Sequence, residues 1–343
     1  MTPSRPVVLL KPEPQSGPRI FTPAARVRLE STFDVIDLEG VDDASAIDRA
    51  LPAAFAVVGQ PDLDTDRLVR AQHLRAIVNV EGNFFPNVDY ETAFQRGIRV
   101  LGCGTAYADS VAEMALGLAV DLARGITRED RAFREGRERY VSEGTHDSIL
   151  LRGSTIGLVG FGNIGRRLAT LLKPFRAHLL AYDPWLPAAA LKDHGVDAAR
   201  LSWVLSRSDI VFVLATVTSE SEHLLGAQQL DLLKKGARLV LVSRASVADY
   251  DALYRAVAAG RVQAAVDVWP EEPMPRRDPA RNLDGLVMSP HRAGGIPQAF
   301  FEIGDMVCDD LELIAQGLPP VRLQVAAPEL VGRYRNRPVE ARP

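Results

Sequence analysis

Three polar side chains, a guanidinium, a carboxylate and an imidazole, each come after an apolar run in the second half of the chain. They are Arg244, Glu272 and His291. The runs span residues 239–242, 264–268 and 286–290. If these runs are parallel strands, their carboxyl ends share one sheet edge, where ligands bind in open α/β sheets. An imidazole titrates at about pH 6.5 and can exchange a proton at neutral pH. The pattern predicts acid–base chemistry at that edge.

Each of the three side chains also has a simpler interpretation. A single histidine is more often a surface or core residue, and an arginine usually forms a surface ion pair. Glu272 lies in Pro-Glu-Glu-Pro and could be a solvated turn residue, as we expect for Glu271. The position of His291 directly after the last predicted strand, in Ser-Pro-His-Arg-Ala-Gly-Gly, favours the catalytic interpretation.

A glycine-rich turn predicts where a cofactor would bind. The apolar run 155–159 leads into G-x-G-x-x-G at Gly160, Gly162 and Gly165, and an amphipathic stretch, 166–175, follows. Gly160 permits the turn, Gly162 lets a pyrophosphate approach the backbone, and Gly165 allows close packing of helix on strand. The helix N-terminus attracts phosphate. A second run ends in Asp183, 21 residues after Gly162, where a carboxylate would bind the adenosine ribose hydroxyls. The alternative is an ordinary βαβ turn in which Asp183 only starts the Asp183-Pro184 turn.

Other titratable residues give weaker signals. Asp109 and Glu113 share a helix face, and we expect capping and solvated charges there. His194 and His223 lie in polar loops without the spacing of metal ligands, so we expect no metal site.

Composition limits the classes of function. The 343 residues predict two domains, and 47% hydrophobic residues can fill two cores. The net charge of −4 is spread without a Lys/Arg block, so we expect no nucleic-acid partner. Two cysteines, no signal-peptide core and no apolar run near ~18 residues predict a cytoplasmic protein that does not bind membranes.

Short apolar runs alternate with amphipathic stretches along the chain, which is typical of parallel sheets covered by helices. Expected strands include 7–10, 34–38, 55–58, 74–80 and 98–101, then about six more within 107–296. Expected helices include 22–32, 112–123, 127–140, 230–235, 247–258 and 300–316. Gly236 is expected to end the helix 230–235, and the tail from Ala326 is expected to fray.

At this point the chain resembles the D-isomer-specific 2-hydroxyacid dehydrogenases, over about residues 70–317. Several motifs appear in the family's order: Asp109-Ser110-Val111-Ala112-Glu113; the Gly160/Gly162/Gly165 loop with Asp183-Pro184; Arg244 followed by Val247-Ala248-Asp249; Asp267-Val268-Trp269 with Glu272-Pro273; and Ser289-Pro290-His291. The resemblance implies an α/β fold with a Rossmann-type doubly wound parallel sheet at 107–296. It also implies a smaller flavodoxin-like α/β substrate domain at 1–106, completed by a return helix and tail at 297–343.

The resemblance implies an NAD-dependent oxidoreductase that acts on a D-2-hydroxy acid or its 2-keto acid, as a homodimer. It assigns catalysis to Arg244, Glu272 and His291: His291 moves the proton, Glu272 orients it, and Arg244 holds the substrate carboxylate. Substrate binding is assigned to Gly82, Asn83, Arg244 and His291. Cofactor binding is assigned to Val111, Gly160, Gly162, Asn163, Ile164, Gly165, Asp183, Pro184, Thr216, Ser243, Arg244, Asp267, His291 and Gly294.

Some positions depart from the family pattern. Phe84 replaces a glycine of the loop 80–89, Tyr107 an asparagine, and Thr216 a frequent proline. Ala245-Ser246 replaces Gly-Gly. Phe84, Phe85 and Tyr107 predict either a bulky, apolar substrate pocket or a different packing of the loop.

Two further functions stay open. One is D-3-phosphoglycerate dehydrogenase, within the same class. The other is an NAD-sensing binding protein or corepressor, which shares the fold and keeps the catalytic residues. Formate dehydrogenase is disfavoured, because that group usually has glutamine where Glu272 stands.

Overall fold

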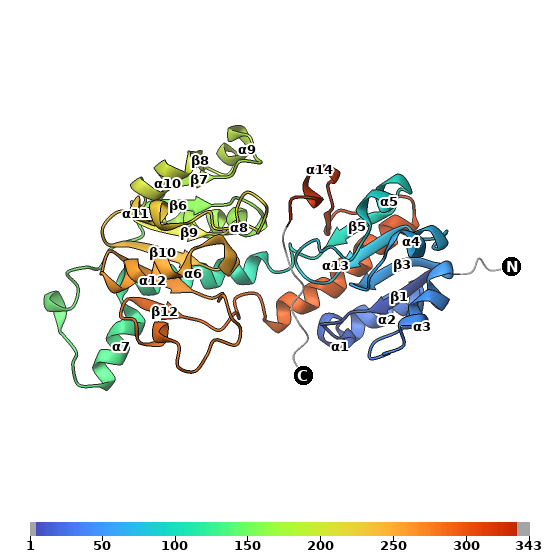
Figure 1. The fold of residues 1–343 in the computed structure, drawn as a ribbon, viewed down its shortest axis with the longest axis horizontal. Helices are drawn as coiled ribbons and strands as arrows, with labels where there is room; N and C mark the ends of the chain where they lie inside the picture. Colours follow the sequence, from blue (N-terminus) through green and yellow to red (C-terminus); the bar gives the residue numbers. More distant parts are fainter. Residues whose placement is uncertain (1–4, 335–343) are drawn as a thin grey trace. The chain divides into compact units, whose positions relative to one another are not determined.

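The computed structural model describes residues 5–334, which form two compact units. Unit 1 combines the chain up to Tyr107 with the chain from Ile296, and unit 2 spans Ala108–Gly295. Figure 1 shows the elements of both. Within the described part of the chain, no helix is both long enough and apolar enough to cross a membrane.

Unit 1 contains a six-stranded sheet in the order β13-β5-β4-β3-β1-β2. Its strands are β1 (Val7–Lys11), β2 (Asp34–Asp37), β3 (Ala54–Gly59), β4 (Ala76–Asn79), β5 (Arg99–Gly102) and β13 (Gln324–Val325). Its helices are α1 (Gly17–Ile20), α2 (Pro23–Thr32), α3 (Ala44–Ala50), α4 (Thr65–Arg70), α5 (Tyr90–Gln95), α13 (Pro297–Ala315) and α14 (Pro328–Val331). The five parallel strands have the flavodoxin-like order 2-1-3-4-5.

Helix α13 belongs to the core of unit 1 although it follows unit 2 in sequence. Ile303 and Val307 lie in one buried cluster with Leu29 of α2. A Cβ on Gly304 would clash with the carbonyl oxygen of Ile20, so only glycine lets α13 approach α1 this closely. Figure 1 shows α13 lying along the sheet.

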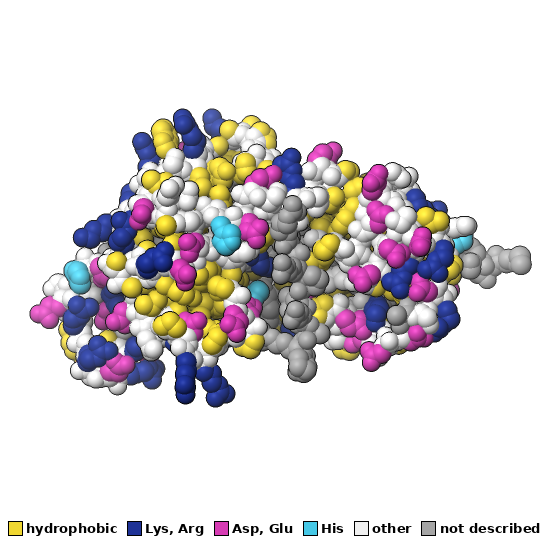
Figure 2. Space-filling model, in the orientation of Figure 1, with side chains coloured by type: hydrophobic (Ala, Val, Ile, Leu, Met, Phe, Trp, Pro, Cys, Tyr) yellow, Lys and Arg dark blue, Asp and Glu magenta, His cyan; other side chains and the backbone are white. Residues whose placement is uncertain are grey.

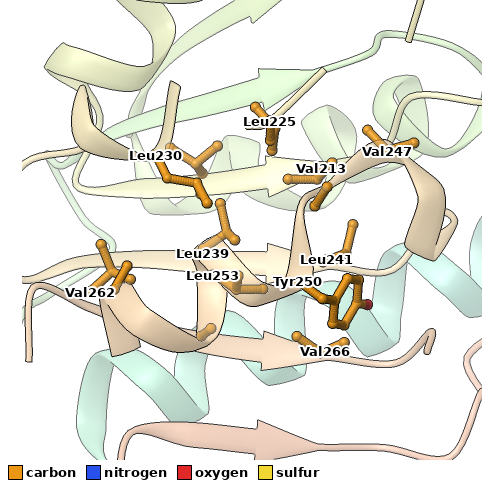
Figure 3. Close-up of a cluster of buried hydrophobic side chains, with 14 of the residues drawn as sticks. Val213, Leu225, Leu230, Leu239, Leu241, Val247, Tyr250, Leu253, Val262 and Val266 are labelled. Atoms are coloured by element: carbon orange, nitrogen blue, oxygen red, sulfur yellow. The ribbon is translucent and has the colours of Figure 1, made fainter. Parts of the chain in front are cut away.

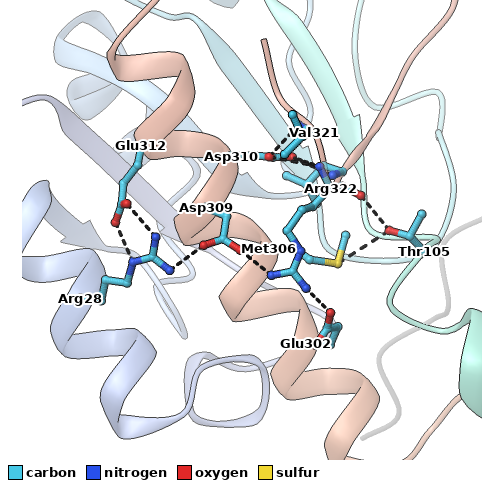
Figure 4. Close-up of polar contacts among 10 residues, drawn as sticks. Arg28, Thr105, Glu302, Met306, Asp309, Asp310, Glu312, Val321 and Arg322 are labelled. Carbon is cyan, nitrogen blue, oxygen red and sulfur yellow. Dashed lines mark hydrogen bonds and ion pairs between the residues drawn. The ribbon is translucent and has the colours of Figure 1, made fainter. Parts of the chain in front are cut away.

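Ion pairs add to this packing (Figure 4). Arg28 binds both oxygens of Glu312, at 2.7 and 2.8 Å, and Asp309 at 2.7 Å. Arg322 bridges Asp309 and Glu302 on the same helix. The pKa of Arg28 is raised, because Glu312 and Asp309 accept its hydrogen bonds.

The expectation that the tail frays from Ala326 is wrong for the described residues. Strand β13 pairs antiparallel with β5, and Ala326 is buried. The fully buried carboxylate of Asp310 accepts hydrogen bonds from the backbone N–H groups of Val321, Arg322 and Leu323. This one side chain therefore anchors the segment that leads into β13. The rest of the tail, 335–343, lies outside the described residues.

Unit 2 contains a seven-stranded parallel sheet in the order β12-β11-β10-β9-β6-β7-β8. Its strands are β6 (Thr155–Val159), β7 (His178–Tyr182), β8 (Asp197–Ala198), β9 (Ile210–Val213), β10 (Ala237–Leu241), β11 (Val262–Val266) and β12 (Leu286–Met288). Its helices are α6 (Ala108–Arg124), α7 (Ile126–Arg134), α8 (Asn163–Leu172), α9 (Ala188–Lys192), α10 (Leu201–Arg207), α11 (Ala227–Asp231) and α12 (Tyr250–Ala258). The strand order is the Rossmann order 3-2-1-4-5-6 with a seventh strand added, so the predicted fold class is confirmed.

The core on one face of this sheet lies beneath α11 and α12 (Figure 3). Leu239 and Leu241 of β10 are fully buried and belong to the same cluster as Leu253 of α12. Strands buried on both faces consist of nearly continuous apolar residues, which is why the sequence showed them as runs.

Three helix predictions were wrong at their ends. The helix expected at 127–140 ends at Arg134, because Gly136 adopts a left-handed conformation with φ 65°. The helix expected at 230–235 lies at Ala227–Asp231 instead, and short turns follow it. The helix expected from 247 begins at Tyr250, because the side chain of Asp249 caps it by accepting from the N–H of Ala252 at 3.0 Å.

Candidate active site

The ends of three neighbouring strands form the edge that carries the predicted chemistry. Leu241 of β10 pairs in register with Val266 of β11, which pairs with Met288 of β12. Arg244 lies three residues after Leu241 of β10, and His291 lies three residues after Met288 of β12. The fold therefore brings both to the same carboxyl edge.

His291 and Glu272 are in direct contact. The imidazole Nδ1 lies 2.7 Å from Glu272 Oε2, and the two side chains are 33% and 24% exposed. The other oxygen of Glu272 accepts a hydrogen bond from the backbone N–H of Trp269 at 2.9 Å. The indole N–H of Trp269 in turn donates to the carbonyl of Ser289 at 2.8 Å. With Nδ1 engaged by Glu272, Nε2 is the ring nitrogen that can exchange a proton with a substrate.

The loop that carries His291 is held by Asp267, which is 1% exposed at the end of β11. Asp267 Oδ1 accepts from the backbone N–H of Arg292 at 3.0 Å and from the hydroxyl of Ser289. Asp267 Oδ2 accepts from the backbone N–H of Ala293 at 2.9 Å. His291 lies between these anchors with φ 48°, a conformation that is uncommon outside glycine. The carboxylate thus holds the backbone that follows His291 and the Ser289 side chain that precedes it.

Arg244 begins the turn after β10 in an extended conformation, with φ −147° and ψ 144°. Its Nη1 donates to the carbonyl of Ser243 at 2.8 Å. The Ser243 hydroxyl is buried and has no hydrogen-bond partner among residues 5–334. Buried hydroxyls in native proteins usually have a partner, so an orphan at this edge fits a site that a polar ligand completes.

The glycine loop has the geometry that a bound pyrophosphate requires. Gly160 has φ 96°, and a Cβ there would meet the backbone of Ala215 within 2.8 Å. A Cβ on Gly165 would meet the carbonyl of Gly160 at 3.0 Å, so α8 packs closely on the turn. A Cβ on Gly162 would meet nothing within 4 Å, so this glycine faces outward where a phosphate would approach. The first turn of α8, with Asn163 and Ile164, follows directly.

Asp183 starts the turn at Pro184, as one of the two interpretations of the sequence predicted. One carboxylate oxygen accepts from the N–H of Phe161 in the glycine loop at 2.8 Å, and the other accepts from Trp185 at 3.0 Å. The side chain therefore stabilises the turn at Pro184 and lies against the glycine loop, where it can also accept from a ribose.

The remaining predicted cofactor residues lie on other elements of unit 2. Val111 is buried in α6. Thr216 follows β9, and its backbone carbonyl accepts a hydrogen bond from the hydroxyl of Ser221. Gly294 directly follows Arg292 and Ala293, whose N–H groups bind Asp267. Asp109 was expected to be a capping or solvated charge. It is exposed, as expected of a solvated charge, and forms a two-pronged ion pair with Arg167 of α8.

The predicted substrate loop belongs to unit 1. Phe84 and Phe85 are 5% and 4% exposed, so both side chains are buried in unit 1. Tyr107 donates from its hydroxyl to the carbonyl of Val80 at 3.3 Å and lies against Gly82. Asn83 is half-buried next to it.

Sequence reasoning missed the roles of Ser289 and Trp269 in supporting the His291–Glu272 pair. Both stood within quoted motifs, but nothing in their spacing shows a contact between the two loops. Within the described residues, no cluster of His, Cys, Asp and Glu has the arrangement of a metal site.

Comparison with known proteins was consistent with this geometry. Residues 116–293 match the model of the family described as D-isomer specific 2-hydroxyacid dehydrogenase, NAD binding domain. A D-3-phosphoglycerate dehydrogenase of Archaeoglobus fulgidus is 34% identical over 286 residues, which are 82% of this chain and 53% of that protein. A glyoxylate reductase of Korarchaeum cryptofilum is 31% identical over 264 residues, 75% of this chain and 78% of that protein.

A solved structure is similar over nearly the whole chain. It is the crystal structure of a phosphoglycerate oxidoreductase from Rhizobium etli, with a TM-score of 0.86 and 44% identity over 94% of this chain and 99% of that one. By contrast, the chain spans only 53% and 55% of the phosphoglycerate dehydrogenases of A. fulgidus and Methanocaldococcus jannaschii. The chain belongs to the D-isomer-specific 2-hydroxyacid dehydrogenases, and unit 2 contains the family's NAD-binding domain.

Proposed function

We propose that this protein is an NAD-dependent oxidoreductase that interconverts a D-2-hydroxy acid and its 2-keto acid. The observation that carries the proposal is the contact of 2.7 Å between His291 and Glu272 at the carboxyl edge of an NAD-binding sheet. An imidazole held there by a carboxylate can deliver or take the proton that accompanies the transfer of a hydride.

The residues of unit 2 fit a dinucleotide. The outward face of Gly162, the N-terminus of α8 and the carboxylate of Asp183 suit a pyrophosphate and an adenosine ribose. The buried Ser243 hydroxyl has no partner among the described residues and could bind the nicotinamide end. Bound NAD supplies or accepts the hydride at its nicotinamide ring.

In this proposal His291 exchanges a proton through Nε2 with the oxygen on C2 of the substrate. Glu272 orients the ring through its contact with Nδ1. Arg244 binds the substrate carboxylate and polarises the C2 carbonyl with its planar fork of donors. Gly82 and Asn83 of unit 1 are assigned to substrate binding through their backbone N–H groups, and Asp267 supports the nicotinamide end and the His291 loop.

Oxidation of D-3-phosphoglycerate is a second candidate within this class. It is favoured by the names of the relatives at 34% and 44% identity, a phosphoglycerate dehydrogenase and a phosphoglycerate oxidoreductase. An NAD-sensing corepressor is the candidate from another class, because such a protein would keep the same pair.

We further propose a cytoplasmic homodimer without a nucleic-acid partner. Exposed apolar side chains gather after α6, where Phe133 and Val141 are 61% and 83% exposed, and α7 projects from the sheet (Figure 1). Such residues favour association with a second copy. Lys and Arg are interspersed with Asp and Glu on the face drawn in Figure 2, which disfavours nucleic acid. Cys103 and Cys308 are unpaired, as suits the cytoplasm.

The experiment is a panel of 2-keto acids with NADH, followed by the loss of nicotinamide absorbance. The panel should include aliphatic, aromatic and phosphorylated members. Turnover that disappears in His291→Ala supports the dehydrogenase. Tight NADH binding with no turnover of any member would instead support a binding protein.

A further inference from the structure

The C-terminal segment of unit 1, residues 321–334, runs beside β5. Gln324 pairs with Gly102 in the antiparallel ladder of β13 and β5, and the N–H of Ala326 donates to the carbonyl of Val100 at 2.8 Å. The short helix α14 then packs against α5 (Figure 1). Because α5 directly follows the predicted substrate loop in sequence, the segment lies next to both ends of the chain that carries this loop.

Gly104 brings the C-terminal segment close to the predicted substrate loop, residues 80–89. A Cβ on Gly104 would meet the carbonyl oxygen of Gly82 at 2.6 Å and Oε1 of Gln324 at 3.4 Å. The loop and the segment therefore approach the same face of Gly104. Only glycine permits this approach, because any side chain would displace the backbone of the loop.

Phe84 makes the second contact between the loop and the segment. Its ring centroid lies 5.8 Å from that of Tyr334, with the planes inclined at 46°, and both rings pack in the cluster that contains Ala93 of α5. The ring of Phe84 also lies 3.4 Å from where a Cβ on Gly102 would be. Burial raises the pKa of the Tyr334 phenol. Phe84 stands where the family pattern has a glycine, and the C-terminal segment supplies a ring that covers it.

We propose that the C-terminal segment positions the loop for substrate binding, with Tyr334 as a positioning residue that acts through Phe84. This inference rests on the proposed function, in which Gly82 and Asn83 bind the substrate through their backbone N–H groups. Asn83 lies directly between Gly82 and Phe84, so a fixed Phe84 ring restricts the direction of these donors. Donors that are ordered before binding lose less conformational entropy when the substrate arrives. Without the Tyr334 ring, substrate affinity should fall while later steps change little.

The test compares Tyr334→Ala with Tyr334→Phe, which keeps the ring, and with Phe55→Ala as the matched control. Phe55 forms a ring pair with Phe33 at 6.0 Å, also in unit 1, but at the amino end of β3 and so at the sheet edge opposite the loop. The readouts are KM and kcat for the keto acid that wild type reduces fastest, the Kd of NADH, and amide hydrogen exchange of residues 82–85.

Tyr334→Ala should raise KM by about two- to tenfold, the effect expected from losing an aromatic pair, and leave kcat and NADH affinity nearly unchanged. The amides of residues 82–85 should exchange faster by a similar factor. Tyr334→Phe should stay close to wild type. Phe55→Ala should lower the free energy of unfolding without changing KM or the exchange of the loop. In a Phe84→Leu background, Tyr334→Ala should no longer change KM, because its partner ring is gone.

Two results would overturn the inference while leaving the dehydrogenase intact. One is equal exchange of residues 82–85 in wild type and Tyr334→Ala. The other is faster exchange with an unchanged KM, which would show that the position of the loop does not affect the substrate. If wild type reduces no keto acid, the proposed function fails, and the coupling between segment and loop stands only if exchange of the loop still depends on Tyr334.

Discussion

The backbone N–H of Ala293 donates to the buried carboxylate of Asp267 at 2.9 Å, which ties the loop after β12 to the end of β11. The same carboxylate accepts from the backbone N–H of Arg292 and from the hydroxyl of Ser289, so one side chain binds groups on both sides of His291. Asp267 was expected mainly to place the nicotinamide. The structure adds a second role, in which it positions the imidazole.

Asp267→Asn keeps the size of the side chain but turns an N–H donor towards backbone donors. We expect kcat to fall by about tenfold or more, since hydrogen bonds to a charged group contribute about 1.5–3 kcal/mol each. Amide hydrogen exchange at Arg292 and Ala293 should become faster. Ser289→Ala is the matched control, because it removes one donor and should have a smaller effect on both readouts. Unchanged exchange together with a raised KM for NADH alone would mean that Asp267 serves only the cofactor.

Arg244→Lys keeps the positive charge and removes the bidentate fork. Activity on keto acids should fall by about ten- to a hundredfold, corresponding to ~1.5–3 kcal/mol of a charged hydrogen bond. NADH affinity, measured by fluorescence titration, should change much less. Keto-acid kinetics equal to wild type would show that Arg244 is structural.

Asp183 should make the protein prefer NAD to NADP. Its carboxylate lies against the glycine loop and would repel a 2′-phosphate, while exposed Pro184 and half-buried Trp185 follow it in place of an arginine. Catalytic efficiency with NAD should exceed that with NADP by about tenfold or more. Equal efficiency with the two cofactors would refute this assignment.

Gly304→Ala tests how closely α13 must approach the rest of unit 1. The new Cβ would clash with the carbonyl of Ile20, and forced packing of this kind costs roughly 1–3 kcal/mol. Gly117→Ala is the matched control: Gly117 is exposed in α6, a Cβ there meets nothing within 4 Å, and alanine should stabilise the helix by about 0.5–1 kcal/mol. The free energy of unfolding, measured by urea titration, should decrease in Gly304→Ala and increase in Gly117→Ala. A loss of stability confined to unit 2 amides in Gly304→Ala would contradict the packing described for α13.

Local signals made much of the fold predictable. Buried strands such as β9 and β10 appear in the sequence as mainly apolar runs. Thr22 and Pro23 predict the start of α2, where the Thr22 hydroxyl accepts a hydrogen bond from the N–H of Ala25 at 3.1 Å. Long-range pairing left no such signal. Strand β13 has two exposed residues, and the buried Asp310 that anchors the segment before it is a charged residue in a helix, which sequence alone would place on the surface.

The candidate site was predictable as a set of residues but not as a geometry. Arg244, Glu272 and His291 could be chosen because they follow apolar runs, yet the contact between Glu272 and His291 joins two loops with no local spacing. The location of the Phe84 side chain could not be predicted either, because a phenylalanine can line a pocket or fill a core equally well. Its burial at 5% exposure reflects packing that depends on the whole of unit 1.

The central claim is that Glu272 acts on His291 across 2.7 Å. Reduction of a keto acid requires the protonated imidazole, so its rate should fall as the pH rises, and oxidation requires the neutral form, so its rate should climb over the same range. His291→Ala should flatten both profiles and lose on the order of 10²–10⁴ in rate. Glu271→Gln, one residue away and exposed, should leave both profiles in place.

The most direct test is the pH dependence of turnover in both directions for wild type and Glu272→Gln, with the chemical step shown to be rate-limiting. Glutamine keeps the size and removes the charged acceptor of the hydrogen bond to His291. We expect turnover to fall about tenfold or more in both directions across the pH range, the effect of losing a charged hydrogen bond. Turnover of Glu272→Gln equal to wild type in both directions would show that Glu272 is not coupled to His291, and would contradict the assignment of proton transfer to this pair.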